Sequence, residues 1–143
     1  MKFGLLAFPL LLINLVVYNV VAFSGTFGAG TEVLGAELLQ ITLASGDIWT
    51  VRWADIFLLF GLAMLFAELL RATQTGSGSI INHAFSMVVF IVCLLEFILV
   101  PGFGTSVFFI FMMMTLLDVM AGFIVTIVTA RRDFGVAEGA FSG

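Results

Sequence analysis

Residues 106–130 read SVFFIFMMMTLLDVMAGFIVTIVTA, an apolar run interrupted by one acidic residue, Asp118. A helix needs about 20 apolar residues to cross the hydrocarbon core of a bilayer, and this run is long enough. The rest of the chain is similar, since 62% of all residues are hydrophobic and 10% are charged, with a mean hydropathy of +1.27. Soluble domains are about 45–50% apolar and about 25% charged. The sequence therefore predicts an integral membrane protein.

Three further apolar segments precede this one, at residues 3–23, 54–70 and 80–100. The Pro-Gly-Phe-Gly sequence of residues 101–104 is typical of a tight turn, so the last two segments are expected to be antiparallel neighbours. We predict an all-α membrane protein in which residues 1–143 form a single domain, an antiparallel bundle of four transmembrane helices.

The first segment allows two interpretations. Lys2, the apolar run after it and Ala-Phe-Ser at residues 22–24 are compatible with a secretory signal peptide and its cleavage site. The run is long for a signal peptide and carries Asn14 and Tyr18, which favours a retained transmembrane helix. Pro9 lies in the first two turns and is expected to bend this helix without breaking it.

The basic residues predict the orientation of the chain. With four spans, one side of the membrane holds most of them: Lys2, Arg71, Arg131 and Arg132. Only Arg52 lies on the other side. Because positive residues concentrate on the cytoplasmic side, we expect both termini in the cytoplasm of a bacterium and the spans in its inner membrane.

The stretch between the first two segments, residues 24–53, is polar and rich in glycine. Two β-prone runs, 39–43 and 48–52, flank an Ala-Ser-Gly-Asp turn and predict a short extracytoplasmic β-hairpin. Trp49 and Trp53 lie where the chain re-enters the bilayer, the usual depth of interfacial tryptophans. The hairpin is either an ordered cap over the helix ends or an exposed docking edge for another protein.

Buried polar residues are the main clue to function. Glu96 and Asp118 lie inside apolar helices, where a charged side chain costs from about 2.5 to more than 10 kcal/mol. Counted from the cytoplasmic helix ends at 1.5 Å per residue, both lie slightly outward of the midplane, as do Asn14 and Tyr18. Thr115 is on the same helix face as Asp118. We expect these five residues to form an intramembrane polar centre in which at least one carboxyl group is protonated.

Three roles for this polar centre remain open. It can hold the helices together through hydrogen bonds, which average about 0.6 kcal/mol each in membranes. It can bind a proton or a cation, or it can contact a polar or basic group of a partner chain. In the third segment the polar residues His83, Ser86, Cys93 and Glu96 recur at helical spacing, so we expect them to share one face.

A second polar group is expected near the cytoplasmic ends of the helices. Glu68 and Arg71 form an i,i+3 pair in the second segment, and Asn82 and His83 open the third. At interface depth this group is expected to be mostly solvated, so that its ion pair contributes little. A role of His83 as a pH sensor is the alternative.

Several classes of function find no support in the sequence. It has no G-x-S-x-G, H-E-x-x-H, P-loop or dinucleotide-binding motif. A single cysteine, Cys93, and a single histidine, His83, provide neither a disulfide framework nor a metal cluster. The net charge of −4 is unsuited to nucleic-acid binding. We therefore predict a non-enzymatic protein without metal or cofactor.

Three stretches carry a resemblance to known proteins. They are G-D-I-W-T at residues 46–50, F-I-V-x-L-L-E-F at 90–97, and L-L-D-V-x-A-G-F followed by A-R-R-D-F within 116–134. Together they resemble small four-helix inner-membrane proteins of proteobacteria that have no assigned activity. The resemblance implies a location in the inner membrane and no particular reaction.

We expect the chain to be an accessory or oligomer-forming subunit of a larger inner-membrane assembly. Its partners would be the lipid bilayer and either other membrane protein chains or further copies of itself, with no nucleic acid. The alternative is a small proton- or cation-coupled carrier or channel that uses the Glu96 and Asp118 pair.

Overall fold

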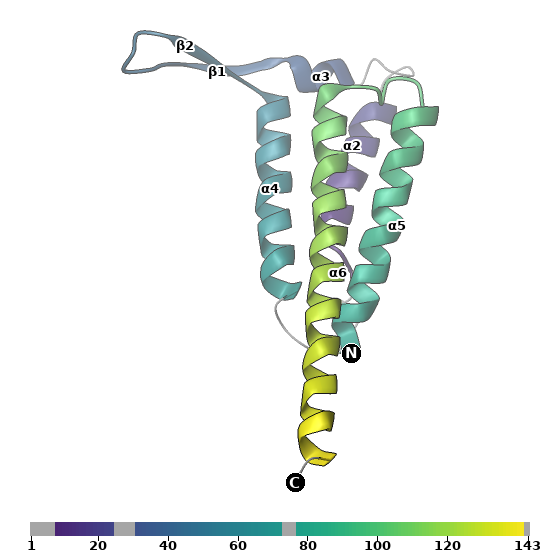
Figure 1. The fold of residues 1–143 in the computed structure, drawn as a ribbon. Helices are drawn as coiled ribbons and strands as arrows, with labels where there is room; N and C mark the ends of the chain where they lie inside the picture. The colour runs from purple at the N-terminus through teal and green to yellow at the C-terminus, as the bar shows by residue number, and fades with distance from the viewer. Residues whose placement is uncertain (1–7, 25–30, 73–76, 142–143) are drawn as a thin grey trace, which may run out of the picture.

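A computed structural model describes residues 8–24, 31–72 and 77–141, and the side chains of all of these except 77–80 and 129–141. The chain is mostly helical, as predicted (Figure 1). Among the described residues, three helices are long and apolar enough to cross a membrane: α4 (Trp53–Ala72), α5 (Ser77–Leu99, with the apolar span Ile81–Leu99) and α6 (Ser106–Phe141, with the apolar span Ser106–Val128). Their lengths follow from long apolar runs without an internal proline.

The first apolar segment forms a shorter helix than predicted. In the described part of the chain, α2 (Leu11–Phe23) has 13 residues and a length of about 20 Å, which is less than the bilayer core of about 30 Å. Pro9 lies before this helix instead of bending it, and its carbonyl accepts a bond from Leu12 N at 3.1 Å. A proline suits a helix start because its missing N–H needs no partner there. The first residues of the predicted segment, 3–7, lie outside the described residues.

The last helix is longer than predicted. The predicted helix ends at residue 130, whereas α6 continues to Phe141 and has 36 residues, or about 54 Å. Its final turns extend beyond the other helices at the end of the chain (Figure 1). Residues 131–141 contain no proline and several good helix formers, so no residue in them terminates the helix.

Four helices, α2, α4, α5 and α6, pack side by side and are called the helical body below. Helix α6 contacts both α4 and α5, and α2 contacts both α4 and α5 (Figure 1). The predicted turn joins α5 to α6, and Gly102 adopts a φ of 88°, which side chains disfavour.

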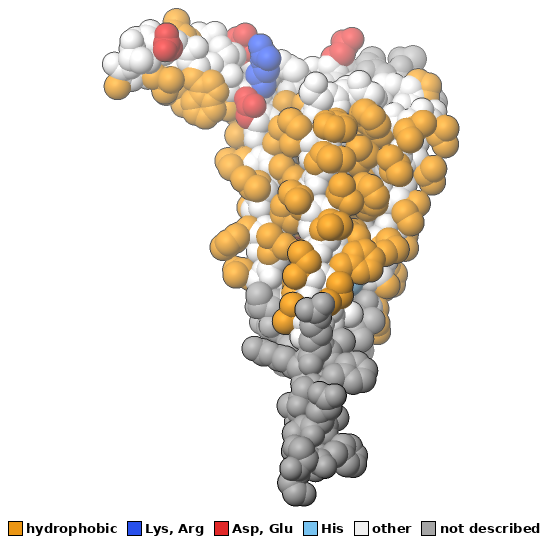
Figure 2. Space-filling model, viewed as in Figure 1, with side chains coloured by type: hydrophobic (Ala, Val, Ile, Leu, Met, Phe, Trp, Pro, Cys, Tyr) orange, Lys and Arg blue, Asp and Glu red, His pale blue; other side chains and the backbone are white. Residues whose placement is uncertain are grey.

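Aromatic rings fill the interior of the helical body near this turn. Tyr18 of α2 lies 4.5 Å from the ring of Phe108 and 5.3 Å from that of Phe103. Phe57 of α4 and Phe111 of α6 extend the cluster. Large hydrophobic side chains also cover the exterior of the helices, which suits contact with lipid (Figure 2).

The predicted hairpin is present at the opposite end of the helical body from the chain termini. Strands β1 (Glu37–Thr42) and β2 (Ile48–Arg52) pair antiparallel, and Gly46 of the turn has a φ of 89°. A short helix, α3 (Glu32–Gly35), precedes β1. The hairpin does not cap the helix ends, because it projects sideways from the start of α4 (Figure 1).

Candidate functional site

The end of the helical body opposite the hairpin contains a fully buried carboxylate. Glu68 of α4 accepts bonds from the backbone N–H of Leu10 at 2.9 Å, from Arg71 Nη1 at 3.4 Å and from the side-chain amide of Asn82. Arg71 also donates to the carbonyl oxygen of Phe8 at 3.3 Å. One carboxylate therefore connects α4, α5 and the segment that leads into α2.

Leu10 explains why an acid lies at this position. It is the N-cap residue of α2, and its own side chain provides no cap. The first N–H groups of a helix lack partners inside the helix and carry a partial positive charge. The Glu68 carboxylate supplies the missing acceptor from another helix. The prediction of a mostly solvated Glu68 is thus wrong, because the start of α2 and the side chain of Asn82 cover it.

A second acid is buried close to this one, on α6. Asp118 is 1% exposed, and neither of its carboxyl oxygens has a hydrogen-bond partner among the described residues. The hydroxyl of Ser86 on α5 lies beside it without completing a hydrogen bond. Asp118 is also within electrostatic range of Glu68 and Arg71.

Further unsatisfied oxygen atoms lie on α5, next to Asp118 and Glu68. Ser86 Oγ is buried and has no partner in the described part of the molecule, and the same is true of Asn82 Oδ1, one turn earlier on α5. Asn82 is bound through its nitrogen to Glu68, which is itself near Asp118. We call Asp118, Ser86 and Asn82 the inner oxygen cluster. Buried polar groups normally have partners, so such a cluster calls for an explanation.

The structure does not bring Glu96 and Asp118 together. Helix α5 ends and α6 starts at the turn of residues 101–104, and Asp118 lies about 13 Å farther from that turn than Glu96 does. Glu96 accepts a bond from Asn19 of α2 at 3.2 Å. The expected shared depth came from counting both positions upward from cytoplasmic ends. Those ends are not level, because α6 continues far beyond the start of α5.

The other members of the predicted polar centre also have separate partners. Tyr18 Oη bonds with Thr105 Oγ1 at 3.0 Å, in the turn before α6. Asn14 Nδ2 donates to the carbonyl of Phe57 at 3.4 Å. Thr115 Oγ1 donates to the carbonyl of Met112 in its own helix at 2.7 Å. The predicted residues thus have separate hydrogen-bond partners and form no common centre in the described structure.

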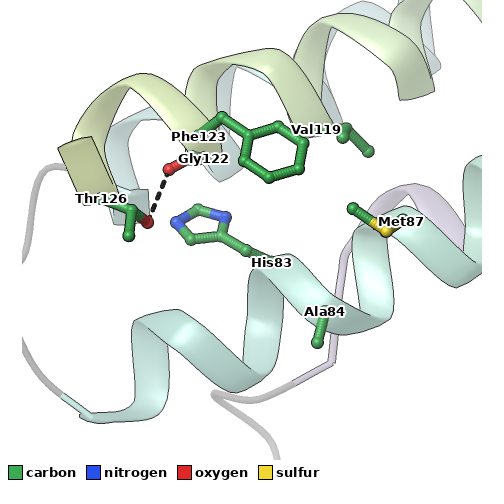
Figure 3. Close-up of a pocket in the computed structure, with 7 residues that line it drawn as sticks. All are labelled: His83, Ala84, Met87, Val119, Gly122, Phe123 and Thr126. Atoms are coloured by element: carbon green, nitrogen blue, oxygen red, sulfur yellow. Dashed lines mark hydrogen bonds between the residues drawn. The ribbon is translucent and has the colours of Figure 1, made fainter.

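His83 lies on the side of α5 that faces α6. Its ring rests against Gly122, and a Cβ atom added at Gly122 would overlap the imidazole (Figure 3). Thr126 Oγ1, near the ring, donates to the carbonyl of Gly122 at 2.9 Å (Figure 3). A cavity of about 290 Å³ opens beside them, and its lining is mostly apolar: His83, Ala84, Met87, Val119, Gly122, Phe123 and Thr126. Among the described residues, no group of three or more His, Cys, Asp and Glu is placed to hold a metal.

The buried face of α5 contains two of the four residues predicted to share a face, Ser86 and Cys93. It carries Asn82, Ser86, Val89 and Cys93, whereas His83 and Glu96 lie beside it and are half-buried. Sequence reasoning placed Asn82 only in the solvated group. The spacing of 4, 3 and 4 in this set is typical of one helix face, and it was the signal that could have identified Asn82.

The hairpin tryptophans are both exposed in the isolated chain. Trp49 lies in β2 and Trp53 is the first residue of α4. Both lie at the end of α4 that starts the apolar span.

Comparison with family models, curated proteins and solved structures found no match to this chain. The function is therefore inferred from the residues and their arrangement alone.

Proposed function

We propose that this chain is a non-enzymatic protein of the bacterial inner membrane that serves as an accessory or oligomer-forming subunit of a larger assembly. In this proposal α2, α4, α5 and α6 form an antiparallel four-helix transmembrane bundle. The buried contact of Leu10 with Glu68 supports a membrane position for α2, because it puts the start of this short helix level with the last turns of α4.

The observation that carries the proposal is the position of the hairpin. It extends beyond the helical body, and its sheet has two strands, so each strand has one edge without a partner in the described part of the chain (Figure 1). Unpaired strand edges recruit strands from other chains. An isolated two-stranded hairpin is marginally stable, so further contacts are expected to hold this one.

The orientation in the proposal rests on the basic residues. Arg71 lies in the last turn of α4, at the end of the helical body where the chain terminates, and Arg131 and Arg132 fall in the extension of α6 beyond its apolar span. Excess positive charge favours the cytoplasmic side. The hairpin would then face the periplasm.

Affinity purification from native membranes in a mild detergent tests this role. We expect other chains, or further copies of this one, to remain bound. A photo-crosslinking residue at Gln40, in β1, should capture the same chain, whereas one at Leu59, on the exposed face of α4, should not. A monomer that crosslinks to no protein from Gln40 would contradict the subunit role.

A second candidate function is proton- or cation-coupled transport, centred on Asp118 instead of the predicted Glu96 and Asp118 pair. The charges of Glu68 and Arg71 offset each other through their ion pair. An ionised Asp118 would therefore leave an unbalanced negative charge in the interior, which is costly. A proton on its carboxyl group, or a cation held by the inner oxygen cluster, would remove that cost. Hard cations such as Na⁺ prefer a ligand set of oxygen atoms alone.

Flux measurements in liposomes test this candidate. If it is correct, purified protein moves protons or Na⁺, and Asp118→Asn abolishes the flux. Glu96→Gln is the matched control, since Glu96 is half-buried and already accepts a bond from Asn19. Transport that survives in Asp118→Asn, or no transport by the wild-type protein, would contradict the candidate.

A further inference from the structure

The pairing of the two strands sorts the hairpin residues into two faces. Residues that pair directly across an antiparallel ladder lie on the same face, and successive residues alternate. The pairs Leu39 with Val51 and Ile41 with Trp49 therefore form one face, called the apolar face below. The intervening pairs form the other face, and it is more polar: Gln40 with Thr50, and Thr42 with Ile48.

The apolar face is on the side of the hairpin that faces the helical body (Figure 2). At the base of the hairpin Val51 is only 6% exposed, and β2 contacts α4 there. Farther out the same face has no cover, since Leu39, Ile41 and Trp49 are all more than 40% exposed, at 45%, 41% and 51%. Hydrophobic side chains gather on the side of the hairpin that faces the helices, and they lead onto the hydrophobic surface of α4 (Figure 2).

The hairpin is attached to α4 at a defined depth. Strand β2 ends at Arg52, and α4 with its apolar span begins at the next residue, Trp53. Two bonds fix the junction: Trp53 N donates to the carbonyl of Ala36 at 3.2 Å, and Arg52 N donates to Asp55 Oδ2 at 2.8 Å. The hairpin is therefore attached at the first residue of the apolar span, and it projects sideways from α4 (Figure 1).

We propose that the apolar face of the hairpin lies on the lipid bilayer, at the boundary between headgroups and acyl chains of the leaflet where α4 begins. The lipid-facing surface of α4 continues onto this face, so lipid is expected to cover both surfaces. Trp49 would sit at the depth that interfacial tryptophans prefer. The polar face would contact water, and the strand edges would run along the membrane surface. This inference concerns lipid and goes beyond the proposed assembly role.

Tryptophan fluorescence in lipid nanodiscs tests the placement, because the chain has two tryptophans. Trp53→Phe leaves Trp49 as the only reporter, on the apolar face. The matched control, Ile48→Trp in a chain with Trp49→Phe and Trp53→Phe, puts the reporter one residue away on the opposite face. We expect acrylamide to quench Trp49 at least threefold less than the control indole. Phosphatidylcholine brominated near the headgroup end of its acyl chains should quench Trp49 more strongly than the control.

Two results would overturn the proposal. Equal acrylamide quenching of both indoles would show that the hairpin stands in water. If Trp49 is protected from acrylamide but brominated lipid does not quench it, a protein covers the apolar face. That protein is a second copy of the chain if the protection decreases when the protein is diluted in lipid. Nitroxide labels at Ile41→Cys and Gln40→Cys give an independent measurement that does not alter either tryptophan. Oxygen should relax the first label more than a water-soluble nickel reagent does, and the reverse should hold for the second.

Discussion

The backbone N–H of Leu10 donates to the Oε2 atom of Glu68 at 2.9 Å, so a side chain of α4 caps the start of α2. The bond joins residues that are far apart in sequence, and the acceptor is fully buried. In the membrane interior an uncapped helix start would leave N–H groups without water to satisfy them. Capping the start of α2 is a structural role that explains the burial of Glu68, and no catalytic or transport role is needed to explain it.

Glu68→Ala is expected to destabilise the protein strongly. It leaves Arg71, Asn82 and the N–H of Leu10 without their shared acceptor, and loss of one partner of a buried ion pair costs about 3–5 kcal/mol. Unfolding in mixed detergent, followed by circular dichroism, measures the change. The matched control is Glu32→Ala at an exposed acid of α3, which should stay within about 0.5 kcal/mol of wild type. Equal stability of the two variants would show that the cap is dispensable.

Gly122→Ala is expected to disturb the contact between α5 and α6. The new Cβ atom would overlap the ring of His83, and relief of such overpacking costs about 1–3 kcal/mol. His83→Ala should remove most of this cost, so the double-mutant cycle should give a coupling of about 1 kcal/mol or more. Gly104→Ala is the control, because a Cβ atom there meets no atom within 4 Å. Additive effects of Gly122→Ala and His83→Ala would contradict the contact.

Much of the fold could be predicted from local patterns. The long apolar runs gave α4, α5 and the membrane part of α6, and the Ser-Gly-Asp turn between β-prone runs gave the hairpin. The ends of helices were harder. Pro9 was expected inside a helix and lies before it, and α6 was expected to end at residue 130 although the residues after it contain no proline.

The polar residues were less predictable, because their partners depend on the relative heights of helices. Composition identified Asp118 and Glu96 as unusual, but a count from helix ends that are not level placed them side by side. The burial of Glu68 depends on the start of α2, which is distant in sequence. On α5 the predicted face was right for Ser86 and Cys93, whereas Asn82 is buried in place of the adjacent His83, since neighbouring residues differ by about 100° around a helix.

Tyr18 and Thr105 should be energetically coupled at the hairpin end of the helical body. Their hydroxyl groups bond at 3.0 Å, and Thr105 Oγ1 also accepts from the N–H of Phe108 at 3.1 Å, as an N-cap of α6 does. Tyr18→Phe keeps the aromatic contacts and should cost about 0.6 kcal/mol, the average for such a bond in a membrane. Thr105→Val loses both bonds and should cost about 1 kcal/mol more.

The same unfolding measurement checks this pair, with Thr105→Ser as the control that keeps the hydroxyl group. The Tyr18→Phe and Thr105→Val double variant should be less destabilised than the sum of the two single variants. A strictly additive double variant would mean that the two hydroxyl groups do not bond in the membrane.

Asp118→Asn should leave the stability of the protein unchanged or increase it, in contrast to Glu68→Gln. An amide at position 118 can keep the contact with the Ser86 hydroxyl, and it places no charge in the interior. Glu68→Gln, by contrast, removes the negative charge that offsets Arg71. We expect the Asn variant to unfold at equal or higher detergent concentration than wild type and the Gln variant at lower concentration. If Asp118→Asn proves as damaging as Glu68→Gln, then Asp118 is held as a charged partner in the membrane, and it is not the group that takes up a proton or cation.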